Sequence, residues 1–310
     1  MRRILVTGAS GFVGRLLVQR LGDAGFPLTL AGRTATPVQG DNSRSFAVGG
    51  VDRNTDWRPA LEDCDAVIHL AAQVPGPGVT DEVFSEVNDR GTARLVDQAA
   101  SSGARQFVLM SSLSAVSDNS SSAPINEQTL PEPSTSYGRS KLAGESHMVM
   151  FEGRDRIAIT IRPPIVYGAG AQGNWLLLQR LAATRVPLPF GSINNCRTLI
   201  AAENLVDALV RVVSMPEPKS GTFLVSDGES ISLREILTWL RKGMGIPPRL
   251  VPIPSSALNA LLHAVGRERI AKSLLGDLQV DSSLFRNTFG WSPQLHPSEA
   301  IVRSGASFKR

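Results

Sequence analysis

The fold is decided near the start of the chain by the stretch Ile4-Leu5-Val6-Thr7-Gly8-Ala9-Ser10-Gly11-Phe12-Val13-Gly14. Its apolar beginning predicts a short buried strand, and the leucines that follow it have the spacing of a helix. A strand, a glycine-rich turn and a helix start, in this order, bring backbone N–H groups and a helix N-terminus against a pyrophosphate. The stretch therefore predicts a dinucleotide site.

The three glycines of this turn are spaced as G-x-x-G-x-x-G, which differs from the common G-x-G-x-x-G fingerprint. One glycine permits the tight turn, one lets the backbone approach phosphate, and Gly14 allows close packing of helix on strand. The alternative is a plain strand, turn and helix with flexible glycines. The order of the elements favours the dinucleotide site.

Short apolar runs alternate with helical stretches through the first half of the chain. Buried parallel strands are predicted at residues 4–6, 28–31, 66–70, 107–110 and 157–161, and helices at 81–102 and 137–151. Alternating strands and helices imply right-handed βαβ units, and so an α/β fold with a doubly wound, Rossmann-like parallel sheet.

The sequence changes character after residue 166, where proline and glycine punctuate shorter segments. We expect a dinucleotide-binding domain at residues 1–166 and a smaller C-terminal substrate lobe at 167–310. The chain is expected to return to the first domain around residues 199–226. The polar tract at 117–124 predicts a mobile loop near the active site, and Ser232 with Glu235 predicts a capping box at the start of a helix.

Bulk properties exclude several classes of protein. The net charge of +4 comes from scattered residues, so no nucleic-acid-binding tail is indicated. Cys64 and Cys196 form no C-x-x-C, and the four histidines have no metal-ligand spacing, so no metal site is expected. No apolar run reaches the ~20 residues of a membrane span, and no signal-peptide core is present. We expect a reduced, cytoplasmic protein.

A second motif lies in Ser136-Tyr137-Gly138-Arg139-Ser140-Lys141. In a helix, its tyrosine and lysine lie four residues apart on one face. A nearby cation lowers the pKa of a phenol and brings it into range for proton transfer. The alternative is an exposed helix on which this spacing has no function. Together with the glycine-rich turn, the pair predicts an acid/base centre.

Three more segments complete the pattern: His69-Leu70-Ala71-Ala72, Ser111-Ser112 and Arg162-Pro163-Pro164-Ile165-Val166-Tyr167-Gly168. In this order the five motifs resemble the extended, nucleotide-sugar-modifying branch of the short-chain dehydrogenase/reductase superfamily, with its NAD(P)-dependent epimerase/dehydratase family. The nearest likeness is to 4-epimerases and 4-keto reductases of UDP-N-acetylhexosamines in bacterial surface-polysaccharide synthesis.

The resemblance assigns catalytic roles to three residues. Ser112 would hydrogen-bond the reacting oxygen, Tyr137 would exchange its proton, and Lys141 would bind the nicotinamide ribose and depress the tyrosine pKa. For Ser112 the alternative is capping of a strand end. The residues expected to contact the cofactor are Gly8, Ser10, Gly11, Phe12, Val13, Gly14, Arg33, Val51, Leu70, Ala71, Ala72, Ser111, Tyr137, Lys141 and Pro164.

The end of the second predicted strand bears on the choice of cofactor. An acidic residue about 20 positions after the glycine turn would bond the ribose 2′-OH of NAD. Gly32-Arg33 stands there instead, and an arginine suits a 2′-phosphate. This favours NADP(H), with NAD(H) as the alternative if Arg33 stacks on adenine or faces solvent. Adenine contacts are expected from the backbone near Val51 or from Asp52.

The resemblance also implies a binding site for a nucleoside-diphosphate sugar, with Ser112 and Tyr137 at the sugar. Arg197 would clamp the diphosphate, unless it forms a surface salt bridge, and Asn174 would donate a hydrogen bond, unless it caps a helix. Asn88 would hold backbone near the active site or lie on the surface.

The reaction expected from this resemblance is NADPH-dependent reduction of a UDP-linked 4-keto-6-deoxy-N-acetylhexosamine. One alternative is a UDP-glucose or UDP-N-acetylglucosamine 4-epimerase with bound NAD, which uses the same residues. Another is a non-catalytic nucleotide-binding regulatory protein. A homodimer is expected through the helices at 81–102 and 137–151, which carry surplus apolar residues: Val83, Phe84, Val87, Met148, Val149 and Met150.

Overall fold

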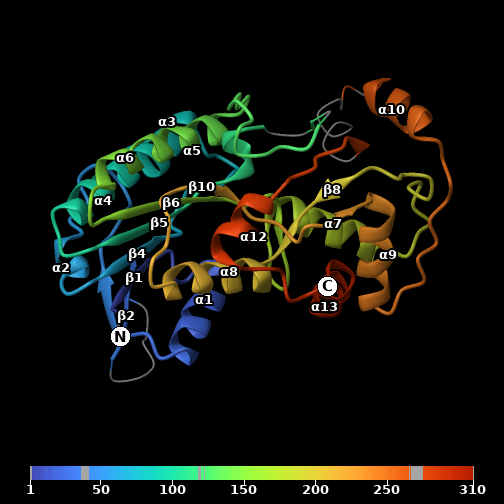
Figure 1. Cartoon of the computed structure of the whole chain (residues 1–310). Coiled ribbons are helices and arrows are strands. Elements are labelled where there is room, and N and C mark those ends of the chain that lie inside the picture. The colour runs from blue at the N-terminus through green and yellow to red at the C-terminus, as the bar shows by residue number, and fades with distance from the viewer. Residues whose placement is uncertain are drawn as a thin grey trace.

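The structure is a computed structural model that describes residues 2–35, 42–117, 120–121, 123–264, 266 and 275–309. A seven-stranded parallel sheet forms its centre, in the order β10-β6-β5-β4-β1-β2-β3 (Figure 1). The strands are β1 (Ile4–Thr7), β2 (Leu28–Gly32), β3 (Arg44–Ala47), β4 (Ala66–His69), β5 (Gln106–Met110), β6 (Ile157–Arg162) and β10 (Gly221–Leu224). The predicted doubly wound fold is confirmed.

Helices cover both faces of this sheet, as Figure 1 shows. One layer consists of α1 (Phe12–Asp23), α8 (Ala202–Ser214) and α12 (Ser283–Phe289). The other layer consists of α2 (Arg58–Leu61), α3 (Asp81–Phe84), the π-helix η1 (Ser85–Arg90), α4 (Gly91–Ala100), α5 (Ser136–Ser146) and α6 (Met148–Phe151).

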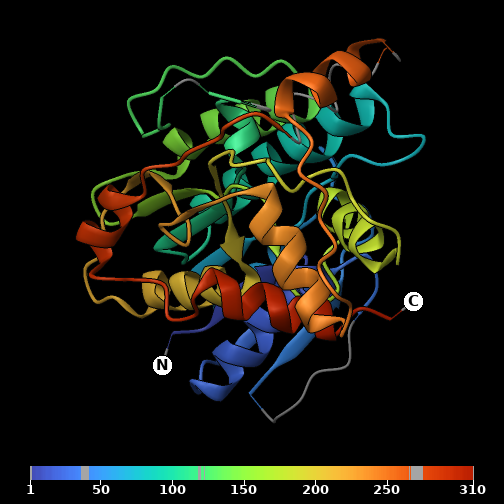
Figure 2. The same ribbon diagram turned by 90° about the vertical axis from the view of Figure 1, so that its right-hand side faces the viewer.

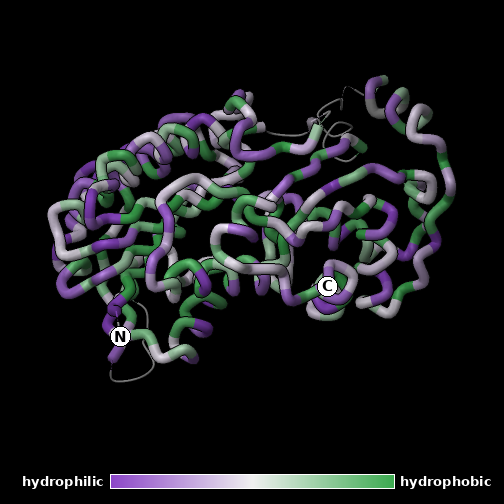
Figure 3. The backbone as a smooth tube through the Cα atoms, viewed as in Figure 1, coloured by the Kyte–Doolittle hydropathy of each residue, from purple (hydrophilic) through white to green (hydrophobic). Residues whose placement is uncertain are grey.

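Alternation along the strands explains why there are two layers. Ile4 and Val6 of β1 belong to the core under α1 and α8, whereas Leu5 between them belongs to the core under α2, α4 and α6. The strands are buried on both faces and therefore read as continuous apolar runs. Hydrophobic and hydrophilic residues alternate along the tube of the covering helices (Figure 3), because only one side of each helix meets the sheet.

The elements outside the central sheet and its two helical layers are short strands and several helices, which are here called the second lobe. The strands are β7 (Val166–Tyr167), β8 (Arg197–Thr198), β9 (Ile200–Ala201) and β11 (Ser230–Ile231), and the helices are α7 (Gly173–Ala183), α9 (Leu233–Gly243), α10 (Ser255–Ala264) and α13 (Pro297–Ala306). The predicted capping box of Ser232 and Glu235 is present at α9. Figure 2 shows α9 and α13 side by side. A Cβ on Gly243 of α9 would lie 2.0 Å from the carbonyl oxygen of Val302, so the contact requires glycine.

Both edge strands were absent from the sequence prediction. The residues of β3 are half-buried or exposed, and β10 begins with an exposed glycine, so neither strand reads as an apolar run. The expectation of a mobile loop at 117–124 stays a prediction. Ser121 and Ile125 donate backbone hydrogen bonds to Asp277 and Gln279 (2.9 and 2.8 Å), which attaches the described part of this segment to the C-terminal region. Residues 118, 119 and 122 lie outside the described residues.

Candidate active site

The glycine-rich turn joins β1 to α1 at the carboxyl edge of the sheet. Gly8 has a φ of +70°, and a Cβ there would lie 2.7 Å from the backbone nitrogen of Ala71. A Cβ on Gly14 would lie 2.1 Å from the carbonyl oxygen of Gly8, so this glycine brings α1 close to the turn, as predicted. Gly11 is the N-cap of α1 and supplies no side-chain acceptor. The first N–H groups of α1 are therefore suited to a phosphate of a dinucleotide.

Ser112 and Tyr137 meet beyond the end of β5. Ser112 begins the short helix η2 (Leu113–Ala115), and its hydroxyl accepts a hydrogen bond from the Ser114 backbone nitrogen (3.1 Å). The same side chain hydrogen-bonds the phenol of Tyr137. The capping role and the contact with Tyr137 thus occur together. Gly138 makes this approach possible, because a Cβ on it would lie 2.2 Å from the carbonyl oxygen of Ser114.

The pKa of Tyr137 departs from the sequence prediction. Burial raises the pKa of this phenol, and the hydrogen bond with Ser112 opposes the rise. The expected lowering by Lys141 is therefore wrong for the protein alone. Lys141 instead donates to the carbonyl oxygen of Met110 (2.6 Å). Tyr137 is held in its protonated form near neutral pH, with its ring edge-on to Phe84 at 5.9 Å.

Lys141 itself is buried, and burial lowers the pKa of its amine to about 8, while the Glu145 carboxylate opposes that change. Glu145 lies one turn further along α5, and it pairs with Arg162 and accepts a hydrogen bond from Ser111. Ser111 therefore faces this carboxylate. Glu145 was not predicted from the sequence, although it follows Lys141 at a spacing of four residues.

Asn88 and His69 support the site from inside the protein. The side chain of Asn88 is buried in the π-helix and binds both the nitrogen and the carbonyl oxygen of Gln73 (2.8 and 2.9 Å). The backbone-holding alternative for Asn88 is thus confirmed. His69 is buried between Thr7 and Thr92, and burial lowers the pKa of its imidazole to about 3. It is a neutral core residue.

The remaining predicted cofactor residues follow other strands of the same sheet. Arg33 is exposed immediately after β2, and Pro164 is buried just after β6. Val51 packs on the start of α4, where a Cβ on Gly91 would lie 2.8 Å from its side chain. Asp52 accepts hydrogen bonds from Asn54 and Thr55, so its carboxylate is engaged in a local turn. Parallel strands end at one edge, which places these segments around a common crevice.

The two predicted diphosphate-binding residues differ in environment. Arg197 is buried and donates to the carbonyl oxygen of Gly276 (2.9 Å), so the surface salt-bridge alternative is wrong. Burial lowers the pKa of its guanidinium, and Asp277 opposes this effect. Asn174 is exposed in the first turn of α7, whose N-cap is Gln172, so the capping alternative for Asn174 is wrong too.

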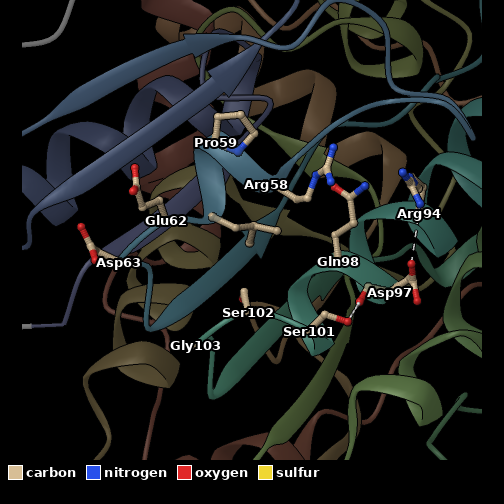
Figure 4. Close-up of a pocket in the computed structure, with 11 residues that line it drawn as sticks. Arg58, Pro59, Glu62, Asp63, Arg94, Asp97, Gln98, Ser101, Ser102 and Gly103 are labelled. Carbon is tan, nitrogen blue, oxygen red and sulfur yellow. Dashed lines mark hydrogen bonds and ion pairs between the residues drawn. The ribbon is translucent and has the colours of Figure 1, made fainter.

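A cavity of about 640 Å³ lies between α2 and the end of α4, away from these residues (Figure 4). Arg58 and Arg94 on its wall pair with Asp56 and Asp97, so nearby carboxylates already compensate both guanidinium groups. It forms no part of the candidate site. Within the described residues, no cluster of histidine, cysteine and acidic side chains could hold a metal ion, and no helix is long and apolar enough to cross a membrane.

The site combines a glycine-rich turn suited to a dinucleotide with a group of three polar side chains at the same sheet edge: Ser112, Tyr137 and Lys141. This combination is typical of an NAD(P)-dependent enzyme that transfers a hydride and a proton. Residues 4–225 match the family described as NAD dependent epimerase/dehydratase family. The chain is also 33% identical to a UDP-glucose 4-epimerase of Vibrio cholerae, with 99% of this chain and 95% of the relative covered.

Two solved structures have a similar fold. The UDP-N-acetylglucosamine 4-epimerase from Bacillus cereus gives a TM-score of 0.78 at 23% identity, covering 98% of each chain. The UDP-glucuronic acid 4-epimerase from Bacillus cereus in complex with NAD gives 0.77 at 20% identity, covering 98% of this chain and 96% of that one. The chain belongs to the NAD-dependent epimerase/dehydratase family of extended short-chain dehydrogenases/reductases, and it is an NAD(P)-dependent enzyme.

Proposed function

We propose that this enzyme inverts the C4 hydroxyl of a UDP-linked hexose or N-acetylhexosamine. The observation that carries the proposal is the Ser112 and Tyr137 hydrogen bond beside buried Lys141, at the sheet edge where the glycine turn would hold a dinucleotide. The UDP-glucose 4-epimerase of Vibrio cholerae, similar over nearly the whole chain, supports the choice of reaction.

In this proposal, some residues transfer the proton and others bind the cofactor and the substrate. Bound NAD would accept the C4 hydride and return it to the opposite face. Tyr137 would have to be ionised to act as the base, a form that the positive charges of the Lys141 amine and of bound NAD would favour. It would then take the proton of the C4 hydroxyl and later give it back, with Ser112 hydrogen-bonded to the reacting oxygen. Lys141 would contact the ribose, and Arg197 in the second lobe would bind the diphosphate. The turn at Gly8 and Gly14 would hold the pyrophosphate.

A direct test distinguishes this proposal from its competitor. The protein as purified is incubated with UDP-N-acetylglucosamine or UDP-glucose without added cofactor, and the sugars are analysed. We expect each substrate to interconvert with its galacto epimer. We also expect denaturation of the protein to release NAD. Stoichiometric consumption of NADPH with a UDP-4-keto sugar, and no interconversion, would contradict epimerisation.

A second candidate is the NADPH-dependent 4-keto reductase, which Arg33 favours. This arginine is exposed directly after β2, where a carboxylate would bind the 2′-OH of NAD. If it binds a 2′-phosphate, Arg33→Asp weakens NADPH binding and spares NADH. Titration of both cofactors against both proteins decides between NADP(H) and NAD(H), and Arg20→Asp on the exposed face of α1 is the matched charge control.

The protein is also proposed to form a homodimer through the layer of α3 to α6. Val83, Val149 and Met150 are 39%, 68% and 68% exposed there, which supports a covered face. Phe84 and Met148, expected at the same interface, are buried within the chain itself. Sedimentation at micromolar concentration should give the dimer mass, and Val149→Glu with Met150→Glu should give the monomer.

A further inference from the structure

Glu145 and Arg162 form a buried ion pair directly behind the catalytic group. Their side chains are 7% and 8% exposed, and the Arg162 Nη2 lies 2.5 Å from Glu145 Oε2. Nε of Arg162 lies 3.0 and 3.2 Å from the two carboxylate oxygens, so the contact is forked. The Ser111 hydroxyl also donates to this carboxylate. Nε and Nη2 of Arg162 and the Ser111 hydroxyl thus all donate to this one carboxylate.

This pair joins the three elements that carry the catalytic site. Glu145 lies on α5 with Tyr137 and Lys141, whereas Ser111 precedes Ser112 at the end of β5. Arg162 ends β6. Backbone bonds from Ser111 to Ile161 and from Leu113 to Pro163, both 2.8 Å, complete the junction of β5 with β6.

The stability of the fold does not by itself explain why this position holds a buried ion pair. Desolvation of two charges offsets most of their attraction, and apolar replacements are often equally stable. A carboxylate at this position has a further consequence, because it lies one helical turn from the Lys141 amine. Its charge favours the ammonium form against the effect of burial on the pKa of Lys141.

Other groups near Lys141 supply no equivalent charge. His69 on β4 is neutral, because burial depresses its pKa, and Tyr137 on α5 is held protonated. Asp89 of the π-helix already pairs with His147 at 2.7 Å, on a partly exposed face further along the layer. Arg162 on β6 is itself positive and is neutralised by Glu145.

We propose that Glu145 is a positioning residue: held by Arg162 and Ser111, it fixes the turn of α5 that follows Lys141 against the ends of β5 and β6 and supplies a negative charge one helical turn from Lys141. The proposal rests on the proposed function, in which Lys141 contacts the cofactor ribose. Glu145→Gln should preserve the shape of the network but remove its negative charge. Glu145→Asp should keep the negative charge on a side chain that is one methylene group shorter.

The experiment measures NADH affinity by cofactor fluorescence between pH 6 and 10, so it needs no sugar substrate. The wild-type affinity should fall as pH rises through the pKa of Lys141, at about 8. In Glu145→Gln this fall should move to lower pH by roughly one unit, because the ammonium has lost its neighbouring charge. Glu145→Asp should keep the fall near the wild-type pH.

Controls separate positioning from folding. Arg241→Gln removes another buried charge far from α5, and it should lower the melting temperature without moving the pH dependence. Lys141→Met should abolish the pH-dependent fall. An unmoved fall in Glu145→Gln, with Lys141→Met still abolishing it, would overturn the proposal alone. A fall that persists in Lys141→Met would overturn the role of Lys141 in the proposed function, and this proposal with it.

Discussion

The chain has two tyrosines, and they lie in regions that use the same phenol differently. Tyr137, at the carboxyl edge of the sheet, is half-buried and hydrogen-bonds the Ser112 hydroxyl. Tyr167, in the second lobe, is fully buried, donates to the Asp227 carboxylate (2.8 Å) and packs on Trp175 at 4.8 Å. Burial raises the pKa of both phenols, and Asp227 raises that of Tyr167 further. Partial exposure at the sheet edge leaves the Tyr137 hydroxyl accessible to a substrate, whereas full burial against Asp227 and Trp175 makes Tyr167 a structural residue.

The two regions are also assembled differently. At the catalytic edge, close backbone approaches at Gly8, Gly14 and Gly138 set the geometry. In the second lobe, buried polar side chains join distant segments. Arg241 donates to the carbonyl oxygens of residues 182, 184, 186 and 248, and Asn204 binds Asp227 and the backbone of residues 294 and 295.

The largest expected effect separates the two tyrosines. Tyr137→Phe should lower kcat by roughly 10²–10⁴-fold, because a general acid/base is lost, while cofactor still binds. Tyr167→Phe should leave kcat within a few-fold and lower stability by about 1–3 kcal/mol, because Asp227 loses a buried donor. Steady-state kinetics and thermal unfolding of both variants provide the measurement. Equal losses of kcat would contradict the distinction.

The difference between local backbone approaches and long-range side-chain contacts explains which features could be predicted from the sequence. The five inner strands of the sheet, the glycine turn and the Tyr137 and Lys141 spacing are local patterns, and these were predicted. Most partners of Arg197 and Arg241 come from segments tens of residues away in sequence, so no local pattern indicates them. The Tyr137 pKa was predicted wrongly for the same reason, because burial depends on the tertiary structure. The predicted domain boundary near residue 166 stays a prediction.

The next effect compares two glycines that would each clash with a backbone carbonyl. An added Cβ would lie 2.2 Å from Ser114 at Gly138 and 2.0 Å from Val302 at Gly243. Gly138→Ala should displace Tyr137 from Ser112 and lower kcat by about 100-fold, as expected of a displacement near 1 Å. Gly243→Ala should cost about 1–3 kcal/mol of stability through overpacking.

Gly22→Ala, on the exposed end of α1 with open space around its Cβ, is the control for both glycine variants. It should leave kcat unchanged and should not destabilise the protein, because alanine in a helix is more stable than glycine by up to about 1 kcal/mol. A Gly138→Ala enzyme with wild-type kcat would mean that the approach of α5 to η2 does not set the catalytic distance.

A pH effect is expected in the second lobe. Burial raises the pKa of Asp227 to about 6, above its value in the unfolded chain, so folding favours the protonated carboxyl. The resulting stability is fully present below the unfolded pKa and is lost as the pH rises through about 6. Wild type should therefore lose a few kelvin of melting temperature relative to Asp227→Asn between pH 4 and pH 7. If the melting temperatures of the two proteins changed with pH in the same way, the Asp227 carboxyl would not be the cause of the pH dependence.

The smallest expected effect concerns the one residue of the second lobe to which we assign ligand binding. Arg197 is buried beside Gly276 and Asp277, and a diphosphate there is remote from the reacting carbon. Its contacts would be the same in the ground state and the transition state, so Arg197→Ala should raise KM about tenfold, or ~1.4 kcal/mol, with kcat nearly unchanged. Arg197→Lys should restore part of the affinity, because it keeps the charge but loses the fork. The same rise of KM at unchanged kcat in Arg241→Gln would show that any damage to the second lobe has this effect. An unchanged KM in Arg197→Ala would make Arg197, like Tyr167, a structural residue.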